Sequence, residues 1–241
     1  MTTLCIDEGN SRVKFALFKD NAIASKGIGI EDLGKLDFKE INGVIISSVL
    51  ADSSTRHFLQ NRSIEFLELN QTLAVPFNIK YQSIQTLGMD RLAAVAGCFA
   101  QFPDRHSLII VLGSCITYNF INNRNEFIGG AISPGFRMRL KAIHHFTSKL
   151  PDIDWNTEDE IEIIGKSTEQ SILSGAILGT CHEISGVIAQ YQSQFENLNI
   201  ITTGGDALFL VSQLKNNIFA DPELILKGLN FIYQHNVYSE K

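Results

Sequence analysis

The chain has 241 residues, 44% of them hydrophobic, which is enough for one large core or two modest ones. Its formal charge is −6, and no stripe of lysines and arginines indicates a nucleic-acid surface. The N-terminus lacks the pattern of a signal peptide, and no apolar run approaches the roughly 18 residues of a membrane span. The four cysteines lie singly in apolar segments, as buried thiols do in a reducing compartment. We therefore expect a cytoplasmic protein with no nucleic-acid or membrane partner.

The first half of the chain is predicted to begin with strands and to continue with alternating helices and strands. Strands are expected at 3–7, 12–18, 22–27, 43–50 and 64–69. A helix is expected at 53–62, with Ser53 or Ser54 as its cap. A further helix starts at Asp90, because apolar residues then recur at helical spacing.

The second half repeats this order. Strands are expected at 107–113, 116–121, 126–133 and 199–205, and helices at about 136–148 and 168–191. Two amphipathic helices close the chain. Mixed strands and helices in this order predict two duplicated α/β domains, 1–105 and 106–241, with mixed sheets and a ligand cleft between them.

A glycine corner between two strands opens each copy. In the first corner, Gly9-Asn10 is explained by the turn of a surface hairpin alone. The same glycine also lets backbone N–H groups approach a phosphate, and Lys14 could neutralise its charge. Asp7 suits a Mg²⁺ that bridges phosphates, usually through water. Both interpretations stay open at this point.

The second copy supplies matching features. Ser114 follows the glycine of its corner and could donate a hydroxyl, as Ser11 could in the first. The glycines of the segment GGDA at 204–207 leave room for a flat ligand such as an adenosine. Two facing corners would therefore fit a nucleotide.

Asp90 and Arg91 lie where a helix is predicted to start. Asp is common as a cap or first-turn residue, so a structural role for Asp90 is about as probable as a chemical one. The chemical interpretation is a carboxylate base with an arginine beside it to hold an anionic substrate. The segment GKST at 165–168 is not a Walker A motif, because Glu160 occupies the place of its first glycine. His144-His145 has no third ligand nearby and does not indicate a metal site.

Six segments follow one another along the chain: DEGNSRVK, YQSIQTLGMDR, GSCIT, GGAISPGFRMRLKAI, STEQSILSGAILG and TTGGDA. In this order they resemble the type III pantothenate kinases, which belong to the superfamily of acetate kinase, sugar kinases, Hsp70 and actin. The resemblance covers nearly the whole chain. It implies two ribonuclease H-like (actin-like ATPase) domains with an interdomain cleft, and ATP-dependent phosphorylation of pantothenate, the first step of coenzyme A synthesis. It also implies a homodimer that uses Mg²⁺ and a monovalent cation, K⁺ or NH₄⁺.

The resemblance also implies roles for particular residues. Asp90 matches the family's catalytic base in its GxDR motif. The implied pantothenate contacts are Tyr81, Gly88, Met89, Asp90, Arg91 and Thr168. The implied nucleotide contacts are Asp7, Glu8, Gly9, Asn10, Ser11, Arg12, Val13, Lys14, Ser114, Gly204, Gly205 and Asp206. Asp7 is also the expected Mg²⁺ residue.

Two positions depart from the family pattern. The second corner usually has an acid two residues before its glycine and another a few residues on, and this chain has Val111 and Asn119 there. The first of those acids serves the family's K⁺ or NH₄⁺ site, and a valine offers no oxygen ligand. An active pantothenate kinase is thus one hypothesis. A regulatory nucleotide- or pantothenate-binding protein, like the Bvg accessory factors, is the second, and a kinase for another small molecule is the third.

Overall fold

The computed structural model describes residues 1–214 and 218–238, whose contacts form two compact units. Unit 1 comprises Met1–Asp104, Ile121–Gly129 and Glu223–Lys241, and unit 2 comprises Arg105–Phe120 and Gly130–Pro222. Along the chain, unit 1 first gives way to unit 2 at residue 105. The segment from Glu223 onward makes its contacts with unit 1 and is assigned to it. The division into domains 1–105 and 106–241 stays a prediction.

Unit 1 is built on a mixed five-stranded sheet with the order β3-β2-β1-β4-β5. Its strands are β1 (Thr2–Glu8), β2 (Val13–Lys19), β3 (Ala22–Ile28), β4 (Gly43–Ser48) and β5 (Leu67–Glu68). β2 runs antiparallel to β1 and β3, whereas β4 runs parallel to β1 and β5. The predicted strand at 64–69 is wrong over its first half, because Ile64 and Phe66 pack against the core without joining the ladder.

Helices cover both faces of this sheet. On one face, Leu33 of α1 (Gly29–Leu33) and Leu59 of α2 (Ser54–Asn61) pack with the apolar residues of β1 and β4. Ser53 caps α2, as predicted, by accepting from the Arg56 N–H. On the other face lie α3 (Met89–Gln101) and α8 (Leu224–Tyr238). Short 3₁₀ turns, η1 (Phe38–Glu40) and η2 (Ile84–Thr86), complete the connections.

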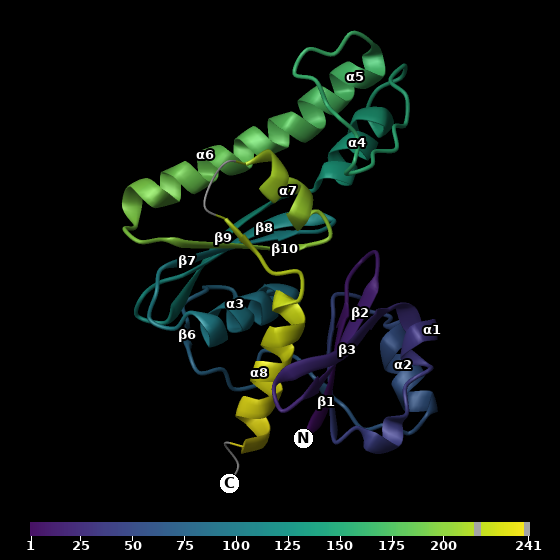
Figure 1. The fold of residues 1–241 in the computed structure, drawn as a ribbon, viewed down its shortest axis with the longest axis vertical. Coiled ribbons are helices and arrows are strands. Elements are labelled where there is room, and N and C mark those ends of the chain that lie inside the picture. Colours follow the sequence, from purple (N-terminus) through teal and green to yellow (C-terminus); the bar gives the residue numbers. More distant parts are fainter. Residues whose placement is uncertain (215–217, 239–241) are drawn as a thin grey trace. The chain divides into compact units, whose positions relative to one another are not determined.

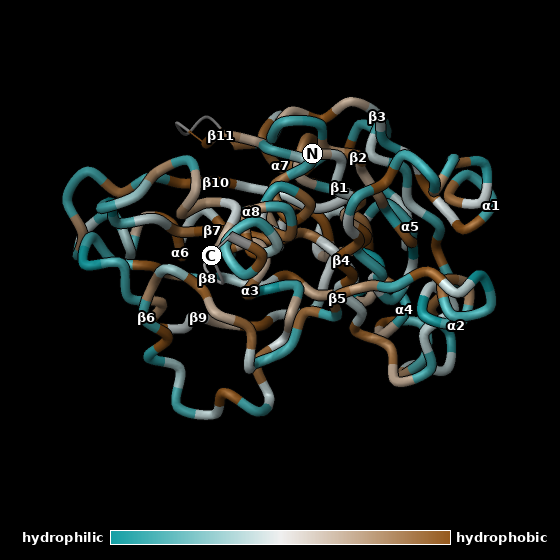
Figure 2. Tube along the Cα trace, turned by 90° about the horizontal axis from the view of Figure 1, so that it is seen from below, coloured by the Kyte–Doolittle hydropathy of each residue, from teal (hydrophilic) through white to brown (hydrophobic). Residues whose placement is uncertain are grey.

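The sheet of unit 2 has the order β11-β10-β7-β8-β9. Its strands are β7 (Ser107–Leu112), β8 (Cys115–Ile121), β9 (Glu126–Pro134), β10 (Asn199–Gly204) and β11 (Phe219–Ala220). The first residues of β9 belong to unit 1, where they pair with β6 (Asn78–Ile79). The brown colour of β7 in Figure 2 reflects its apolar sequence, and all six of its residues are buried.

One face of the unit 2 sheet is covered by helices (Figure 1). These are α4 (Phe136–His145), α7 (Ala207–Gln213) and a long helix made of α5 (Thr168–Leu173), a π-helical turn η3 (Ser174–Leu178) and α6 (Gly179–Gln194). The long helix, Thr168–Gln194, is apolar and long enough to cross a membrane by length and composition alone. Since Ile184 and Ile188 lie in the core of unit 2, the same composition is that of a core helix.

Candidate active site

The carboxyl end of β1 presents two adjacent acids to opposite faces of the unit 1 sheet. Successive residues of a strand alternate between faces. Asp7 pairs in register with Lys14 of β2 and Ser47 of β4, so these three side chains share one face. Glu8 shares the other face with Ser48, on the side that α2 covers.

Asp7 lies in an environment that favours a cation. Burial, the nearby charge of Asp90 and the charge of Glu8 raise the pKa of Asp7 to about 7, although Lys14 acts in the opposite direction. The hydroxyl of Ser47 beside it is buried and has no hydrogen-bond partner in the part of the chain that the structure describes. A carboxylate whose pKa is raised by burial and by a neighbouring negative charge would be stabilised in its ionised form by a divalent cation.

Asp90, the second residue of α3, lies close enough for its charge to raise the pKa of Asp7. Its burial raises its pKa, while the N–H and the positive charge of Arg91 lower it in part. Gly88 is the N-cap of α3, and a Cβ at that position would lie 2.5 Å from the Asp90 Oδ1. The carboxylate therefore occupies space that only a glycine leaves open.

A second group of predicted residues surrounds Arg91, which is buried. Its guanidinium lies 5.3 Å from the centroid of the Tyr81 ring, and its Nη1 donates to the Tyr81 hydroxyl at 3.5 Å. Tyr81 in turn stacks on Phe127 with 6.2 Å between ring centroids. Unit 1 thus brings together Tyr81, Gly88, Met89, Asp90 and Arg91, five of the six residues expected to contact pantothenate.

The tip of the first corner is exposed at Asn10, Ser11 and Arg12. The Gly9 N–H is already used, since it donates to the Arg12 carbonyl at 3.0 Å and closes the turn. Backbone groups available to a phosphate must therefore come from the tip of the corner beyond Gly9.

The Glu8 carboxylate lies on the other face of β1, where hydrogen bonds hold it. Its carboxylate accepts from the hydroxyls of Ser48 and Ser54, each at 2.8 Å, from the Ser53 hydroxyl, and from the Thr55 N–H at 3.1 Å. Burial raises the pKa of Glu8, but these four hydrogen bonds outweigh burial and bring it below its ordinary value. The side chain expected among the nucleotide contacts is thus fully engaged inside the protein.

The second corner is held against the start of α4 in unit 2. The Gly135 N–H donates to the Ser114 carbonyl at 3.1 Å, and a Cβ on Gly135 would collide with the carbonyls of Gly113 and Ser114. Val111 is buried and lies in register with Thr203 of β10, whose buried hydroxyl has no hydrogen-bond partner among residues 1–214 and 218–238. The residue beside Val111 on β10 therefore offers a side-chain hydroxyl.

Asn119 is fully buried and donates to the Ile109 carbonyl at 3.4 Å and the Thr117 hydroxyl at 3.1 Å. The Ile109 carbonyl needs a donor, which an ionised carboxylate cannot supply, whereas the Thr117 hydroxyl could also donate. The amide at this position is therefore fitted to its own surroundings.

The predicted adenosine loop follows β10. Gly204 has φ +102°, and a Cβ there would lie 2.2 Å from the Leu112 carbonyl, so glycine is needed. The Asp206 carboxylate binds Arg137 of α4 through contacts of 2.8 and 3.0 Å. Arg137 also lies over Trp155, 5.1 Å from the ring centroid. Sequence reasoning assigned no role to Arg137, because its link to Asp206 spans 69 positions.

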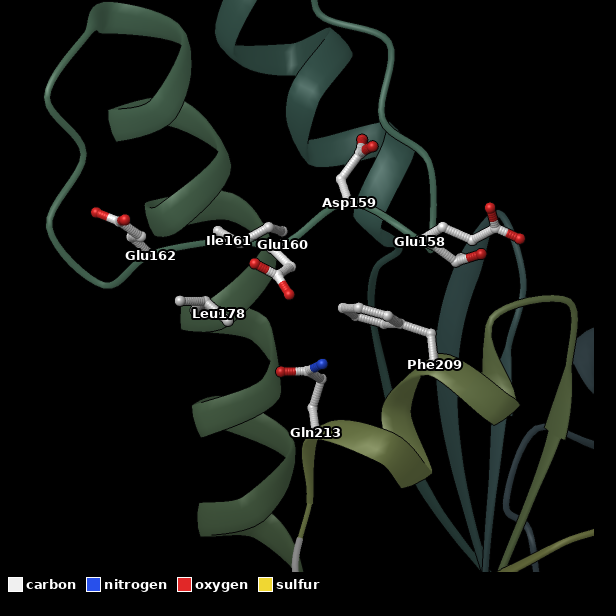
Figure 3. Close-up of a pocket in the computed structure, with 9 residues that line it drawn as sticks. Glu158, Asp159, Glu160, Ile161, Glu162, Leu178, Phe209 and Gln213 are labelled. Atoms are coloured by element: carbon white, nitrogen blue, oxygen red, sulfur yellow. The ribbon is translucent and has the colours of Figure 1, made fainter.

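Thr168 is the first residue of α5 and is exposed, one residue after the Ser167 cap. Unit 2 also has a pocket of about 390 Å³ between the 157–162 segment, η3 and α7. Figure 3 shows Glu160, Leu178, Phe209 and Gln213 around this hollow. None of the predicted site residues lines it.

The donor set fits a magnesium-bound nucleotide better than a protein metal cage. Within residues 1–214 and 218–238 no group of three or more His, Cys, Asp or Glu side chains could hold a metal ion. Mg²⁺ in phosphoryl-transfer sites is commonly held by one or two carboxylates together with phosphates and water. Asp7, as a single carboxylate at the first corner, meets that description.

Similarity to solved structures identifies the fold class of this chain. A Baf family protein from Campylobacter jejuni aligns with a TM-score of 0.65 at 22% identity, covering 98% of this chain and 99% of that one. The activator of 2-hydroxyisocaproyl-CoA dehydratase from Clostridium difficile, solved with bound ADPNP, aligns with a TM-score of 0.55 at 11% identity, covering 100% and 97%. The fold is that of the actin-like ATPases, with ribonuclease H-like domains and mixed sheets, as predicted.

Comparison with known sequences narrows the class to one family. The family model for type III pantothenate kinase matches residues 3–190. The type III pantothenate kinases of Christiangramia forsetii and Flavobacterium johnsoniae are 41% and 36% identical to this chain, each over 97% of it and 98% of the relative. The chain belongs to the type III pantothenate kinases. Nothing in these comparisons favours the regulatory hypothesis, because the likeness to the Baf family structure shows the fold alone.

Proposed function

We propose that Asp90 is the general base with which this chain phosphorylates pantothenate. As a type III pantothenate kinase, the chain transfers a phosphoryl group from ATP to pantothenate in the first step of coenzyme A synthesis. The observation that carries the role of Asp90 is its half-buried position at the start of α3, close enough to Asp7 for the two charges to interact. A carboxylate whose pKa is raised accepts a proton more readily near neutral pH.

In the proposed step the primary hydroxyl oxygen of pantothenate attacks the γ-phosphorus of ATP. A new O–P bond forms, the bond from the γ-phosphorus to the β,γ-bridging oxygen breaks, and ADP leaves. Asp90 takes or orients the hydroxyl proton. Lys14 and the N–H groups of the first corner stabilise the charge spread over the transferring phosphoryl group.

Asp7 is the proposed residue for Mg²⁺, through water, and the cation would neutralise phosphate charge when bound. Support comes from the raised pKa of Asp7 and from the unpartnered Ser47 hydroxyl beside it. In unit 2, the proposed nucleotide contacts are Ser114 and the loop Gly204-Gly205-Asp206, where Arg137 fixes the Asp206 carboxylate.

Pantothenate carries a carboxylate, which suits Arg91. Tyr81 would hold that guanidinium in place through its ring and hydroxyl, while Gly88 and Met89 line the approach to Asp90. Thr168 is the proposed contact from unit 2.

The chain is also proposed to be a cytoplasmic homodimer with no nucleic-acid or membrane partner. In support, four large apolar side chains on α4 and the segment leading to α5 are strongly exposed: Met138, Phe146, Ile163 and Ile164. Covering them would remove apolar surface from water. Sedimentation equilibrium of the parent and of a Phe146→Ser, Ile164→Ser double variant checks this, since a monomeric parent contradicts it.

The decisive experiment is a coupled assay of ADP release with ATP and pantothenate, in potassium buffer and in a bulky organic-cation buffer. ADP release that requires pantothenate supports the proposal. Val111 predicts little difference between the buffers. A folded, nucleotide-binding protein with no turnover would overturn the proposal in favour of a binding role.

A further inference from the structure

Two adjacent acids at the end of β1 have separate environments. Asp7 faces the start of α3, whereas Glu8 faces the N-terminus of α2. Only Asp7 lies on the side of Asp90, and Glu8 is 1% exposed. The role of Glu8 must therefore come from what its carboxylate holds.

We infer that Glu8 is a positioning residue that fixes the end of β1, and with it the Asp7 carboxylate and the first glycine corner, to β4 and α2. This inference rests on the proposed function, because the groups that Glu8 would hold in place are the proposed Mg²⁺ residue Asp7 and the proposed phosphate corner. Glu8 acts through the backbone it anchors and does not contact the substrate.

The hydrogen bonds around Glu8 tie together three segments. Ser48 belongs to the end of β4, Ser53 is the cap of α2, and Ser54 and Thr55 form its first turn. Together they supply four donors, which match the acceptor capacity of one ionised carboxylate. Charge-assisted hydrogen bonds of this kind are stronger than neutral ones, and a helix N-terminus stabilises a negative charge.

The strand continues directly from this anchor into the glycine corner. The Val49 N–H donates to the Glu8 carbonyl at 3.1 Å, so the main chain of Glu8 is held as well as its side chain. Gly9 follows at once and closes the turn by its bond to the Arg12 carbonyl. Loosening Glu8 would therefore free both the preceding Asp7 and the following phosphate corner.

Two variants test this, with Glu68→Gln as the matched control. Glu68 also anchors α2, through Arg56 at 2.6 and 3.2 Å, but does not touch β1. Glu8→Ala removes all four acceptor contacts. Glu8→Gln keeps one oxygen, and a serine hydroxyl can rotate to accept from its amide.

The readouts are kcat, KM for each substrate, Kd for Mg·ATP by calorimetry, and melting temperature. Displacing reacting groups by about 1 Å can reduce rate about 100-fold. Glu8→Ala is expected to lower kcat/KM for Mg·ATP at least tenfold while Kd for pantothenate changes less than about twofold. Glu8→Gln should recover most of the loss, and Glu68→Gln should resemble the parent.

Folded Glu8→Ala protein with parental kcat/KM for Mg·ATP would overturn the inference, as would equal loss of affinity for both substrates. If Glu8→Ala does not fold, Ser54→Ala, which removes one donor, is measured in its place. We then expect a lower kcat/KM for Mg·ATP with a nearly unchanged Kd for pantothenate. An inactive parent chain would contradict the proposed function instead. In that case a weaker Kd for Mg·ATP in the Glu8 and Ser54 variants still supports the inference, and an unchanged Kd overturns it.

Discussion

Replacing Gly88 by alanine tests whether the position of the Asp90 carboxylate matters for the reaction. A Cβ at residue 88 would lie 2.5 Å from the Asp90 Oδ1, whereas ordinary contacts begin at 3.4 Å, so the carboxylate must move by about 0.9 Å. The other contacts of this methyl group, to Arg91, are ordinary at 3.7 Å. The perturbation therefore acts almost entirely on Asp90.

A displacement of this size is expected to reduce kcat about 100-fold, equivalent to about 2.7 kcal/mol in the activation barrier. Stability should change little. Gly88 has φ −62° and ψ 130°, which alanine adopts without strain, and the less flexible unfolded chain favours alanine by about 0.4–1 kcal/mol. Alanine is less favourable than glycine at an N-cap, which offsets this gain.

The assay measures kcat at saturating ATP and pantothenate together with the melting temperature. Gly186→Ala is the control, because nothing lies within 4 Å of its added methyl group. We expect Gly88→Ala to lose turnover while its melting temperature stays unchanged or rises. Gly186→Ala should keep the turnover of the parent. A Gly88→Ala enzyme with parental kcat would refute this account of Asp90, since the reaction would then tolerate a displaced Asp90 carboxylate.

Three further variants probe the surroundings. Since the pKa of Asp7 rises from 3.8 to about 7 on folding, the unfolded chain loses this proton first as pH increases. Without Mg²⁺ or nucleotide, the parent should therefore lose stability between about pH 4 and pH 7, and the melting temperature of Asp7→Asn should rise relative to that of the parent. A difference in melting temperature that does not change with pH would contradict the raised pKa. Val111→Asp should make turnover rise with potassium and should cost several kcal/mol of stability without it. Strong potassium activation of the parent would show that other oxygens form the site. Arg137→Ala leaves the Asp206 carboxylate without this partner and should raise KM for ATP about tenfold. Arg124→Ala, which changes an exposed arginine, is the control. Equal KM values for the two variants would argue against a nucleotide role for the Asp206 loop.

The local parts of the fold were predictable from the sequence. Apolar runs identified the strands around both glycine corners, and Ser53 was one of the two caps expected from their place before a helical pattern. Strand pairing at 64–69 was overestimated, because an apolar run does not distinguish a residue in a ladder from one that packs beside it.

Longer-range features could not be read from one sequence. The return of α8 to unit 1 depends on close helix contact, in which a Cβ on Gly97 would lie 2.2 Å from the Leu224 carbonyl and one on Gly228 1.8 Å from the Ala93 carbonyl. These glycines have no local signature. The pairing of Arg137 with Asp206 likewise requires the folded unit.

The different environments of Asp7 and Glu8 could have been predicted from the sequence. Residues 7 and 8 of one strand must face opposite sides of a sheet, so both could not serve the same ligand through their side chains. Grouping Asp7 to Lys14 by resemblance to one motif concealed this alternation. The sequence pattern of a site therefore indicates where the chemistry lies, and strand geometry indicates which side chains take part.

The most direct test of the central claim is the turnover of Asp90→Asn. The amide keeps the shape of the side chain and can still accept from the Arg91 N–H, but it cannot accept a proton from pantothenate. Loss of a general base typically costs about 100–10,000-fold in rate. We expect kcat to fall within that range while Kd for Mg·ATP and the melting temperature stay close to those of the parent. Turnover within about threefold of the parent would show that Asp90 is only a first-turn residue of α3.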